Sequence, residues 1–318
     1  FNPLAGCLPM ILQMPIFIAL FQVLREMPNY LGSDEGYQFF NLVPNLVMTP
    51  SGAFAEGFGT FVPYLILMVI FAGVLFDYDE VVIKQDITQR LQSPSAAHPF
   101  GTDEMGRDIL ARIFHGARMS LGISVVAVCC SLIVGGFLGS AAGYFGGKID
   151  MVIMRCMDIL LAIPNILLAI TIVAALGASN VNLIIALTVS SVPGFSRIVR
   201  GAVLTVRDAE YIEAARAIGA KTPTIILSHV LPNCMGPILV QTTLNVGSVI
   251  LSTAGLSFLG LGVQPPRPEW GAMLSGGRTY IRDYSYITMF PGIMIMITIL
   301  SLNLLGDGLR DALDPRLK

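Results

Sequence analysis

The sequence predicts an all-α membrane protein, a polytopic helical bundle with about six to seven membrane segments. Its 318 residues are 54% hydrophobic and only 13% charged, and the mean hydropathy is +0.73. Soluble domains carry about 25% charged residues. Apolar runs of the length that crosses a bilayer recur along the chain. They cover residues 8–24, 58–76, 121–145, 159–176, 181–199, 237–261 and 287–306.

The runs differ in what surrounds and interrupts them. A polar, glycine-rich stretch separates the first two, and a charged connecting segment, 74–120, follows them. Within that segment we expect a short amphipathic helix at 103–114. Each of the five later runs is long enough to cross a hydrocarbon core of about 30 Å. Pro164 and Pro193 lie inside two of these runs, where a kink lining a pathway or ordinary helix packing would account for them.

The membrane runs lack ionisable side chains. No Asp, Glu, Lys, Arg or His occurs within 121–147, 159–196, 230–266 or 284–306. Intramembrane ionisable residues are typical of proton relays and ion-coupled carriers. Their absence argues against a proton- or ion-driven transporter, and we therefore expect the energy source to lie outside the membrane.

Several other chemistries are excluded by residue type, and we expect no catalytic residue, cofactor or metal site. The Gly-Lys pair at 147–148 lacks both the first glycine and the Ser or Thr of an ATP-binding phosphate loop. None of the five cysteines forms a Cys-x-x-Cys pair, which favours buried free thiols. The histidines at 98, 115 and 229 lie outside the spans, which argues against an intramembrane hydrolase. A net charge of −2 argues against a nucleic-acid partner.

Small residues are concentrated in "GGFLGSAAGYFGG", residues 135–147. Small side chains spaced four apart allow membrane helices to approach closely. The stretch therefore predicts a helix-packing face.

A polar block, "EYIEAARAIGAKTPTIILSHVLPN" at 210–233, interrupts the apolar sequence. Asp208 is expected to cap a short helix at its N-terminus, and Gly219 to end it. Thr222-Pro223 is expected to start a second helix that Leu231-Pro232 ends. Alanines in the first helix would let another protein approach its backbone closely. The alternative is an ordinary solvated loop helix.

The block resembles the EAA loop of ABC importer permeases. The resemblance lies in Glu213-Ala214-Ala215, Gly219 and "HVLPN" at 229–233, which is similar to the peptide-importer branch. In that family the loop is a cytoplasmic coupling helix that binds the ATPase subunit. The resemblance therefore implies an ATPase-coupling role, within loop 207–233, for Glu213, Ala214, Ala215, Gly219, Leu231, Pro232 and Asn233.

The resemblance extends over about residues 77–318. "PFGTDEMGRDILARIFHGARMSL" (99–121), "GLSFLGLGVQPPRPEWGAML" (255–274) and "NLLGDGLRDALDPRLK" (303–318) are similar to dipeptide/oligopeptide/nickel permeases. This likeness implies the type I ABC importer transmembrane fold, with a permease domain at 121–318 in a bacterial inner membrane. The implied partners are a second homologous permease, two ABC ATPase subunits and an extracytoplasmic solute-binding protein. The subunit would perform no chemistry itself, and peptide, nickel, glutathione or another solute remains possible.

Residues 1–73 differ from the permease pattern. "NPLAGCLP" and "QMPIFIAL" near the start, and "FVPYLILMVIFAG" at 61–73, resemble YidC-type membrane insertases. Arg25 does not match the position of that family's membrane-facing arginine, which argues against insertase activity. An insertase fragment with a permease-like tail is the alternative to an importer permease.

The two resemblances demand opposite orientations. With the insertase orientation, counting spans places block 210–233 outside, where it cannot reach an ATPase. If block 210–233 instead lies on the cytoplasmic side, segment 74–120 is external and the run 58–76 crosses the membrane from the inside to the outside. We therefore interpret residues 73–77 as a junction between unrelated pieces, whether a sequence-assembly artefact, a natural recombination or an engineered chain.

Overall fold

Residues 78–313 make up the part of the chain that the computed structural model describes, and all of them belong to one compact unit, Leu65–Lys318. The runs 8–24 and 58–76, and with them the insertase-like segment 1–73, lie outside the described residues. Between 78 and 313 the structure consists of helices and connecting loops, without a β-strand.

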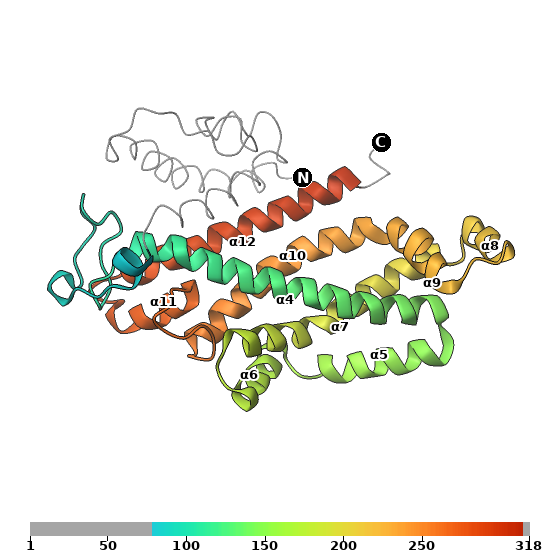
Figure 1. Cartoon of the computed structure of the whole chain (residues 1–318), viewed down its shortest axis with the longest axis horizontal. Helices are drawn as coiled ribbons and strands as arrows, with labels where there is room; N and C mark the ends of the chain where they lie inside the picture. The colour runs from blue at the N-terminus through green and yellow to red at the C-terminus, as the bar shows by residue number, and fades with distance from the viewer. Residues whose placement is uncertain (1–77, 314–318) are drawn as a thin grey trace, which may run out of the picture. The chain divides into compact units, whose positions relative to one another are not determined.

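Nine α-helices follow one another within the described residues (Figure 1). They are α4 (Ile109–Phe145), α5 (Gly147–Leu161), α6 (Asn165–Leu176), α7 (Asn180–Val206), α8 (Glu210–Ala217), α9 (Thr222–Thr224), α10 (Leu231–Phe258), α11 (Trp270–Gly277) and α12 (Tyr286–Leu313). Short π- or 3-10-helical segments are η1 (Tyr78–Ile83), η2 (Ile87–Gln89), η3 (Ile225–Val230) and η4 (Arg278–Tyr280).

The described residues confirm an all-α protein with several helices able to cross a membrane. Four stretches have the required length and apolar character: Ile109–Phe145, Asn180–Val206, Thr222–Phe258 and Tyr286–Gly308. The α5–α6 pair makes a fifth if it is taken as one broken span.

The expected separate helix at 103–114 is wrong. Residues 103–108 form a turn, and a single 37-residue helix, α4, begins at Ile109 and runs on through the apolar sequence. Asp108 marks the start because its Oδ1 accepts a hydrogen bond from the backbone N–H of Ala111 at 2.9 Å. The polar first turns of α4 and its apolar span are therefore one helix.

The predicted membrane run at 159–176 is broken at Pro164. The chain leaves α5 at Ala162 and enters α6 after Pro164, and the two helix axes differ by 84°. Proline lacks a backbone N–H and disfavours helical geometry in the residue before it. Pro164 therefore breaks the span, whereas Pro193 lies buried inside the continuous helix α7.

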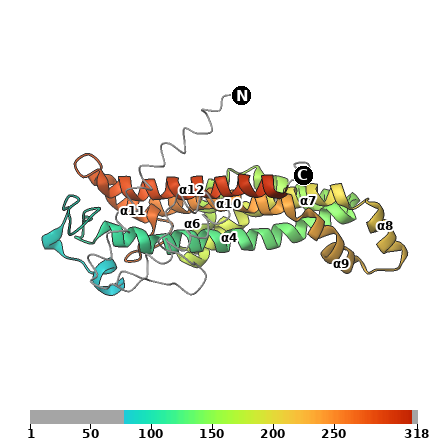
Figure 2. The same ribbon diagram turned by 90° about the horizontal axis from the view of Figure 1, so that it is seen from above.

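The long helices lie side by side, as both views show (Figures 1 and 2). Helices α4, α7 and α12 run in one direction and α10 runs in the other. Consequently α8 and α9 lie at one end of the bundle, and α11 and the segment from 78 to 108 lie at the other. The polar block 210–233 and the described residues 78–108 of the connecting segment thus lie at opposite ends, as the span count with the block inside requires.

The predicted helix-packing face is confirmed. Gly135, Gly139 and Gly143 lie one turn apart on α4 and face α7. A Cβ added at Gly139 would lie 2.4 Å from the carbonyl oxygen of Ser196, and one at Gly143 would lie 2.9 Å from the Cβ of Val203. Only glycine permits this closeness of the two backbones.

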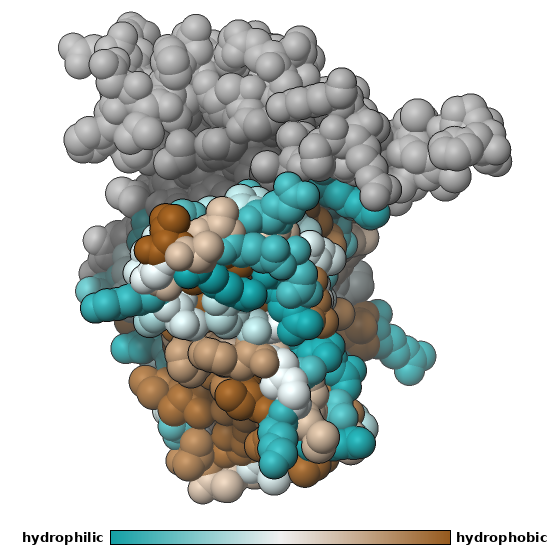
Figure 3. All heavy atoms as spheres, turned by 90° about the vertical axis from the view of Figure 1, so that its right-hand side faces the viewer, coloured by the Kyte–Doolittle hydropathy of each residue, from teal (hydrophilic) through white to brown (hydrophobic). Residues whose placement is uncertain are grey.

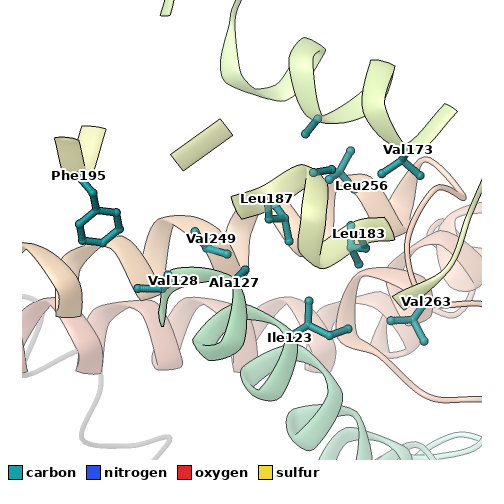
Figure 4. Packing of buried hydrophobic residues seen from close by; sticks show 12 residues of the cluster. Ile123, Ala127, Val128, Val173, Leu183, Leu187, Phe195, Val249, Leu256 and Val263 are labelled. Atoms are coloured by element: carbon teal, nitrogen blue, oxygen red, sulfur yellow. The ribbon is translucent and has the colours of Figure 1, made fainter. Parts of the chain in front are cut away.

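A buried hydrophobic cluster joins α4, α6, α7 and α10. Leu187 of α7 and Leu256 of α10 lie near one another beside Val249, with Ile123 and Ala127 of α4 on the other side (Figure 4). This cluster fixes the positions of the helices around the broken span.

A buried carboxylate holds α11 against α4 at the end opposite α8. Glu269 is fully buried, and its Oε2 accepts from the backbone N–H of Ala272 at 2.9 Å, capping α11. Its Oε1 accepts from the hydroxyl of Ser120 on α4, also at 2.9 Å. The indole N–H of Trp270 donates to the carbonyl of Ile113 at 3.0 Å. The bonds to Ser120 and Ile113 fix the short helix on the long one, and the bond to Ala272 caps it.

Candidate functional site

Helix α8 begins one residue later than its sequence suggests. Ala209 occupies the N-cap position and offers no side-chain hydrogen bond, so the expected capping role of Asp208 is wrong. Asp208 instead accepts from the Nε of Arg207 at 3.1 Å. Glu210 and Glu213 nevertheless lie in the first turn, where negative charge interacts favourably with the helix dipole.

Gly219 ends α8, as predicted. Its φ is +80°, in the left-handed region. Its N–H donates to the carbonyl of Arg216 at 3.0 Å, and the N–H of Ala220 donates to the carbonyl of Ala215 at 3.1 Å. This pair of bonds is the Schellman motif, which satisfies the last carbonyls of a helix and reverses the chain.

One face of α8 packs on the bundle and the other is free. Ile212 and Ala215 are buried in a cluster with Val203 of α7 and with Ile225 and Val230 of η3. The side chains on the other face are exposed. They are Glu210, Glu213, Ala214, Ala217 and, at the C-cap, Ile218, which has 85% of its surface accessible; Tyr211 beside them is also exposed. Two carboxylates and two alanines, with Ile218 at the end, thus form the outward face.

Arginines attach α8 to the end of α4. The guanidinium of Arg216 lies 5.2 Å from the centre of the Tyr144 ring, within the range of a cation–π interaction. Its Nε also donates to the Tyr144 hydroxyl at 3.3 Å. Arg207 donates from Nη1 to the carbonyl of Gly143 at 2.9 Å. Arg216 thus links α8 to the end of α4, and Arg207 links the C-terminal end of α7 to it.

The second helix of the block does not end at Leu231-Pro232, and that expectation is wrong. Thr222–Phe258 is one continuous helical stretch, with Pro223 in its first turn as expected. The π-helical segment η3 immediately precedes Leu231-Pro232 and gives way there to α-helix. The side-chain amide of Asn233 donates to the carbonyl of His229 at 2.6 Å. The π-helical turn accommodates the proline, which lacks an N–H.

Two ion pairs join α5 to α7 near the same end. Arg200 donates through Nε and Nη2 to the two carboxylate oxygens of Asp150, at 2.5 and 2.6 Å. Arg197 donates to Asp158 at 2.6 Å. Sequence reasoning missed these pairs, because 50 and 39 residues separate the partners. The available signal in the sequence was the presence of acidic residues at 150 and 158 and of arginines at 197 and 200.

The structure brings the predicted site residues to one end of the bundle. Most of them are exposed there: Glu213, Ala214, Gly219, Pro232 and Asn233. Ala215 and Leu231 instead belong to the buried cluster beneath α8. Seen from this end, a broad hydrophilic area lies above a more apolar edge on the side of α5 (Figure 3).

No metal-binding group is formed by the described part of the chain: no three His, Cys, Asp or Glu side chains between 78 and 313 are grouped as ligands. This end of the bundle presents a short helix, α8, that is packed on one face and exposed on the other. The turn at Gly219 separates α8 from the continuous helical stretch Thr222–Phe258.

Comparisons with known proteins agree with this arrangement. The family model described as "Binding-protein-dependent transport system inner membrane component" matches residues 135–318. A dipeptide transport system permease protein of Alkalihalophilus pseudofirmus is 51% identical over 253 residues, covering 80% of this chain and 83% of that protein. A glutathione transport system permease protein of Pectobacterium atrosepticum is 44% identical, covering 82% and 86%.

Two further comparisons concern the fold and the N-terminal part. An inward-facing structure of the MetNI methionine ABC transporter has a TM-score of 0.54 at 19% identity, covering 64% of this chain and 96% of that one. The family model described as "60Kd inner membrane protein" matches residues 1–105. Both resemblances noted in the sequence are therefore confirmed, the insertase-like one for the N-terminal part alone. The chain belongs to the binding-protein-dependent transport system inner membrane component family.

Proposed function

We propose that this chain forms the transmembrane pathway of an ATP-driven importer for short peptides or a closely related small solute. We further propose that loop 207–233 receives the movement of the ATPase subunits. The chain is a multi-pass protein of the bacterial inner membrane, and its family implies ATPase and binding-protein partners. The full assembly would contain a second homologous permease, two ATPase subunits and an extracytoplasmic solute-binding protein.

One observation carries the coupling proposal: α8 is held rigidly yet presents a free face. Its inner face is fixed by Ile212 and Ala215, and its end is fixed by the hydrogen bonds around Gly219. Its outer face offers Glu213 and Ala214 to a partner. A helix that is firmly attached on one side can transmit a push as a rigid body, whereas a mobile loop would absorb it.

The substrate class follows from the relatives. The curated relatives named above are dipeptide and glutathione permeases, and both of these solutes are small molecules with peptide bonds. The spans contribute no charged side chain within 159–196 or 230–266. A neutral pathway suits solutes that share a backbone but differ in side-chain charge.

Co-purification with the candidate ATPases tests the coupling role. Glu213→Lys reverses an exposed charge on the outer face, and we expect it to weaken ATPase association and transport while the protein still folds. Asp283→Lys is the matched control, because Asp283 is also exposed but lies beyond α11, at the opposite end of the bundle. Equal retention of ATPase by both variants would contradict the assigned role.

The domain division remains a proposal. We propose an insertase-like fragment at 1–73, a connecting external segment at 74–120 and the permease domain at 121–318. The match of 253 residues to the dipeptide permease is longer than 121–318, so permease likeness includes part of the connecting segment. Insertase activity is the second candidate function and rests on the match to residues 1–105. A single genomic sequencing read that crosses the codons of 73–77 and includes an in-frame upstream start codon would contradict the interpretation of the junction as an assembly artefact.

A further inference from the structure

A cavity of about 130 Å³, open to one side, lies at the break between α5 and α6; of its lining residues, Asn165, Gly194 and Ser248 are exposed. Leu161 and Asn165 line it on either side of the 84° bend. Its other walls are the facing sides of α7 and α10. The bend at Pro164 directs α6 away from the line of α5, and the cavity lies beside this change of direction.

The cavity is polar but carries no charge. Six of its thirteen lining residues have hydroxyl or amide side chains, and none is ionisable. The six are Asn165, Ser190, Ser191, Asn245, Ser248 and Ser252. Its remaining wall is the hydrophobic cluster, to which Leu187, Val249 and Leu256 belong (Figure 4).

The polar residues of α10 are on one face of that helix. Asn245, Ser248 and Ser252 are spaced three and four residues apart, which places them in a row along the wall. On α7 the facing residues are Ser191 and Gly194. A Cβ added at Gly194 would have no atom within 4 Å, so space is open in front of this glycine.

Part of this hydrogen-bonding capacity is unused by the protein. Within residues 78–313, the side chains of Asn165, Ser191 and Ser248 make no hydrogen bond. The Asn245 amide donates to the carbonyl of Gln241 at 3.0 Å, which leaves its oxygen available. Polar groups at membrane depth are costly unless they are satisfied, and these groups face a cavity that water or a polar solute can enter.

We propose that this cavity is a contact site on the solute's path, which holds a peptide group through neutral hydrogen bonds. The proposal rests on the proposed function and adds the residues and the chemistry. A peptide group presents one donor and one acceptor, and an asparagine amide or a serine hydroxyl can complement both. With no ionisable group in the wall, the contact is independent of the charge of the solute's side chains.

The size of the cavity limits what it holds. Pockets that enclose a drug-sized ligand measure roughly 300–1,000 Å³. A cavity of about 130 Å³ therefore accommodates one part of a small solute in this conformation. The site is accordingly one wall of the path and leaves the rest of the solute to other surfaces.

Filling the cavity gives the first test. The transporter is reconstituted in vesicles with its ATPase and binding-protein partners, and dialanine uptake and ATP hydrolysis are measured together. Gly194→Leu places a side chain in the open space, and we expect uptake per ATP hydrolysed to fall at least tenfold. Gly201→Leu is the matched control, since Gly201 lies on the same helix, also faces open space and does not line the cavity. Equal uptake per ATP in both variants would overturn the proposal.

Removing hydrogen bonds without filling the space gives the second test. The double variant Ser191→Ala with Ser248→Ala should lower uptake per ATP by roughly tenfold, which corresponds to about two net hydrogen bonds. The same fold-change is expected for neutral, lysine-containing and aspartate-containing dipeptides. A loss confined to one charge class would overturn the neutral contact. Absence of any peptide uptake by the wild type would instead refute the proposed function.

Discussion

Replacing Gly139 with alanine perturbs the closest approach of α4 and α7. The added Cβ would lie 2.4 Å from the carbonyl oxygen of Ser196, 2.9 Å from the Cβ of Val199 and 3.0 Å from the backbone nitrogen of Arg200. Two of these atoms are backbone, so no side-chain rotation relieves the contact. The helices must separate by several tenths of an ångström along their whole interface.

The change in unfolding free energy caused by Gly139→Ala follows from two opposing effects. Overpacking a well-packed contact costs about 1–3 kcal/mol. Replacing a helical glycine by alanine gains about 0.5–1 kcal/mol in helix propensity. Gly136→Ala provides the matched control, because Gly136 lies on the same helix and an added Cβ there meets no atom within 4 Å. The propensity gain is common to both variants, so the difference between them isolates the packing cost, about 1–3 kcal/mol.

Thermal unfolding of the detergent-solubilised protein measures this difference. For a domain of 150–250 residues, 1 kcal/mol shifts Tm by about 2–4 °C, so we expect Gly139→Ala to unfold roughly 2–12 °C below Gly136→Ala. An unfolding temperature for Gly139→Ala equal to or above that of Gly136→Ala would refute the close-packing argument.

Three further outcomes are expected. Gly219→Ala should lower the unfolding free energy by about 1–2 kcal/mol and weaken ATPase co-purification. The loss comes from left-handed backbone strain alone, because an added Cβ meets open space. Wild-type behaviour in both assays would contradict this. Arg216→Ala and Tyr144→Leu should each slow transport. A double-mutant cycle of these two substitutions on the unfolding free energy should give a coupling of about 0.5–1 kcal/mol. Strictly additive effects of the two substitutions would exclude the contact. Glu269→Gln should cost about 1–2 kcal/mol in unfolding free energy, because neutral hydrogen bonds replace the charge-assisted bonds that the buried carboxylate accepts from Ser120 and the Ala272 N–H. An unchanged Tm would argue against the buried cap.

Local rules predicted some features of the site and failed at others. The left-handed glycine at 219 was predictable because few other residues adopt that conformation at a helix end. Asp208 failed as a cap because the helix starts a residue later and Arg207 competes for its carboxylate. Leu231-Pro232 failed as a stop because the π-helical segment before it accommodates the proline. A capping rule identifies residues suited to a helix end, but tertiary contacts decide whether the helix ends there.

The contacts that give the site its stiffness could not be predicted. Arg216 meets Tyr144 across 72 residues of sequence, and Arg200 meets Asp150 across 50. These pairings depend on how α4, α5 and α7 are placed in space, and no periodicity in one sequence specifies that. By contrast, the glycines of 135–147 predict close packing from residue type alone. Nothing in the sequence identifies α7 as the helix that they contact.

The π-helical segment at Ile225–Val230 has a consequence for the rotational phase of the coupling region. A π-turn holds one residue more than an α-turn, and each residue of an α-helix turns the chain by about 100°. If the segment tightened to regular α-helix, everything before it, including α8, would rotate by about that angle relative to α10. The π conformation therefore sets the direction in which the outward face of α8 points. Deleting one residue between 225 and 230 would let the segment become regular α-helix while keeping that direction.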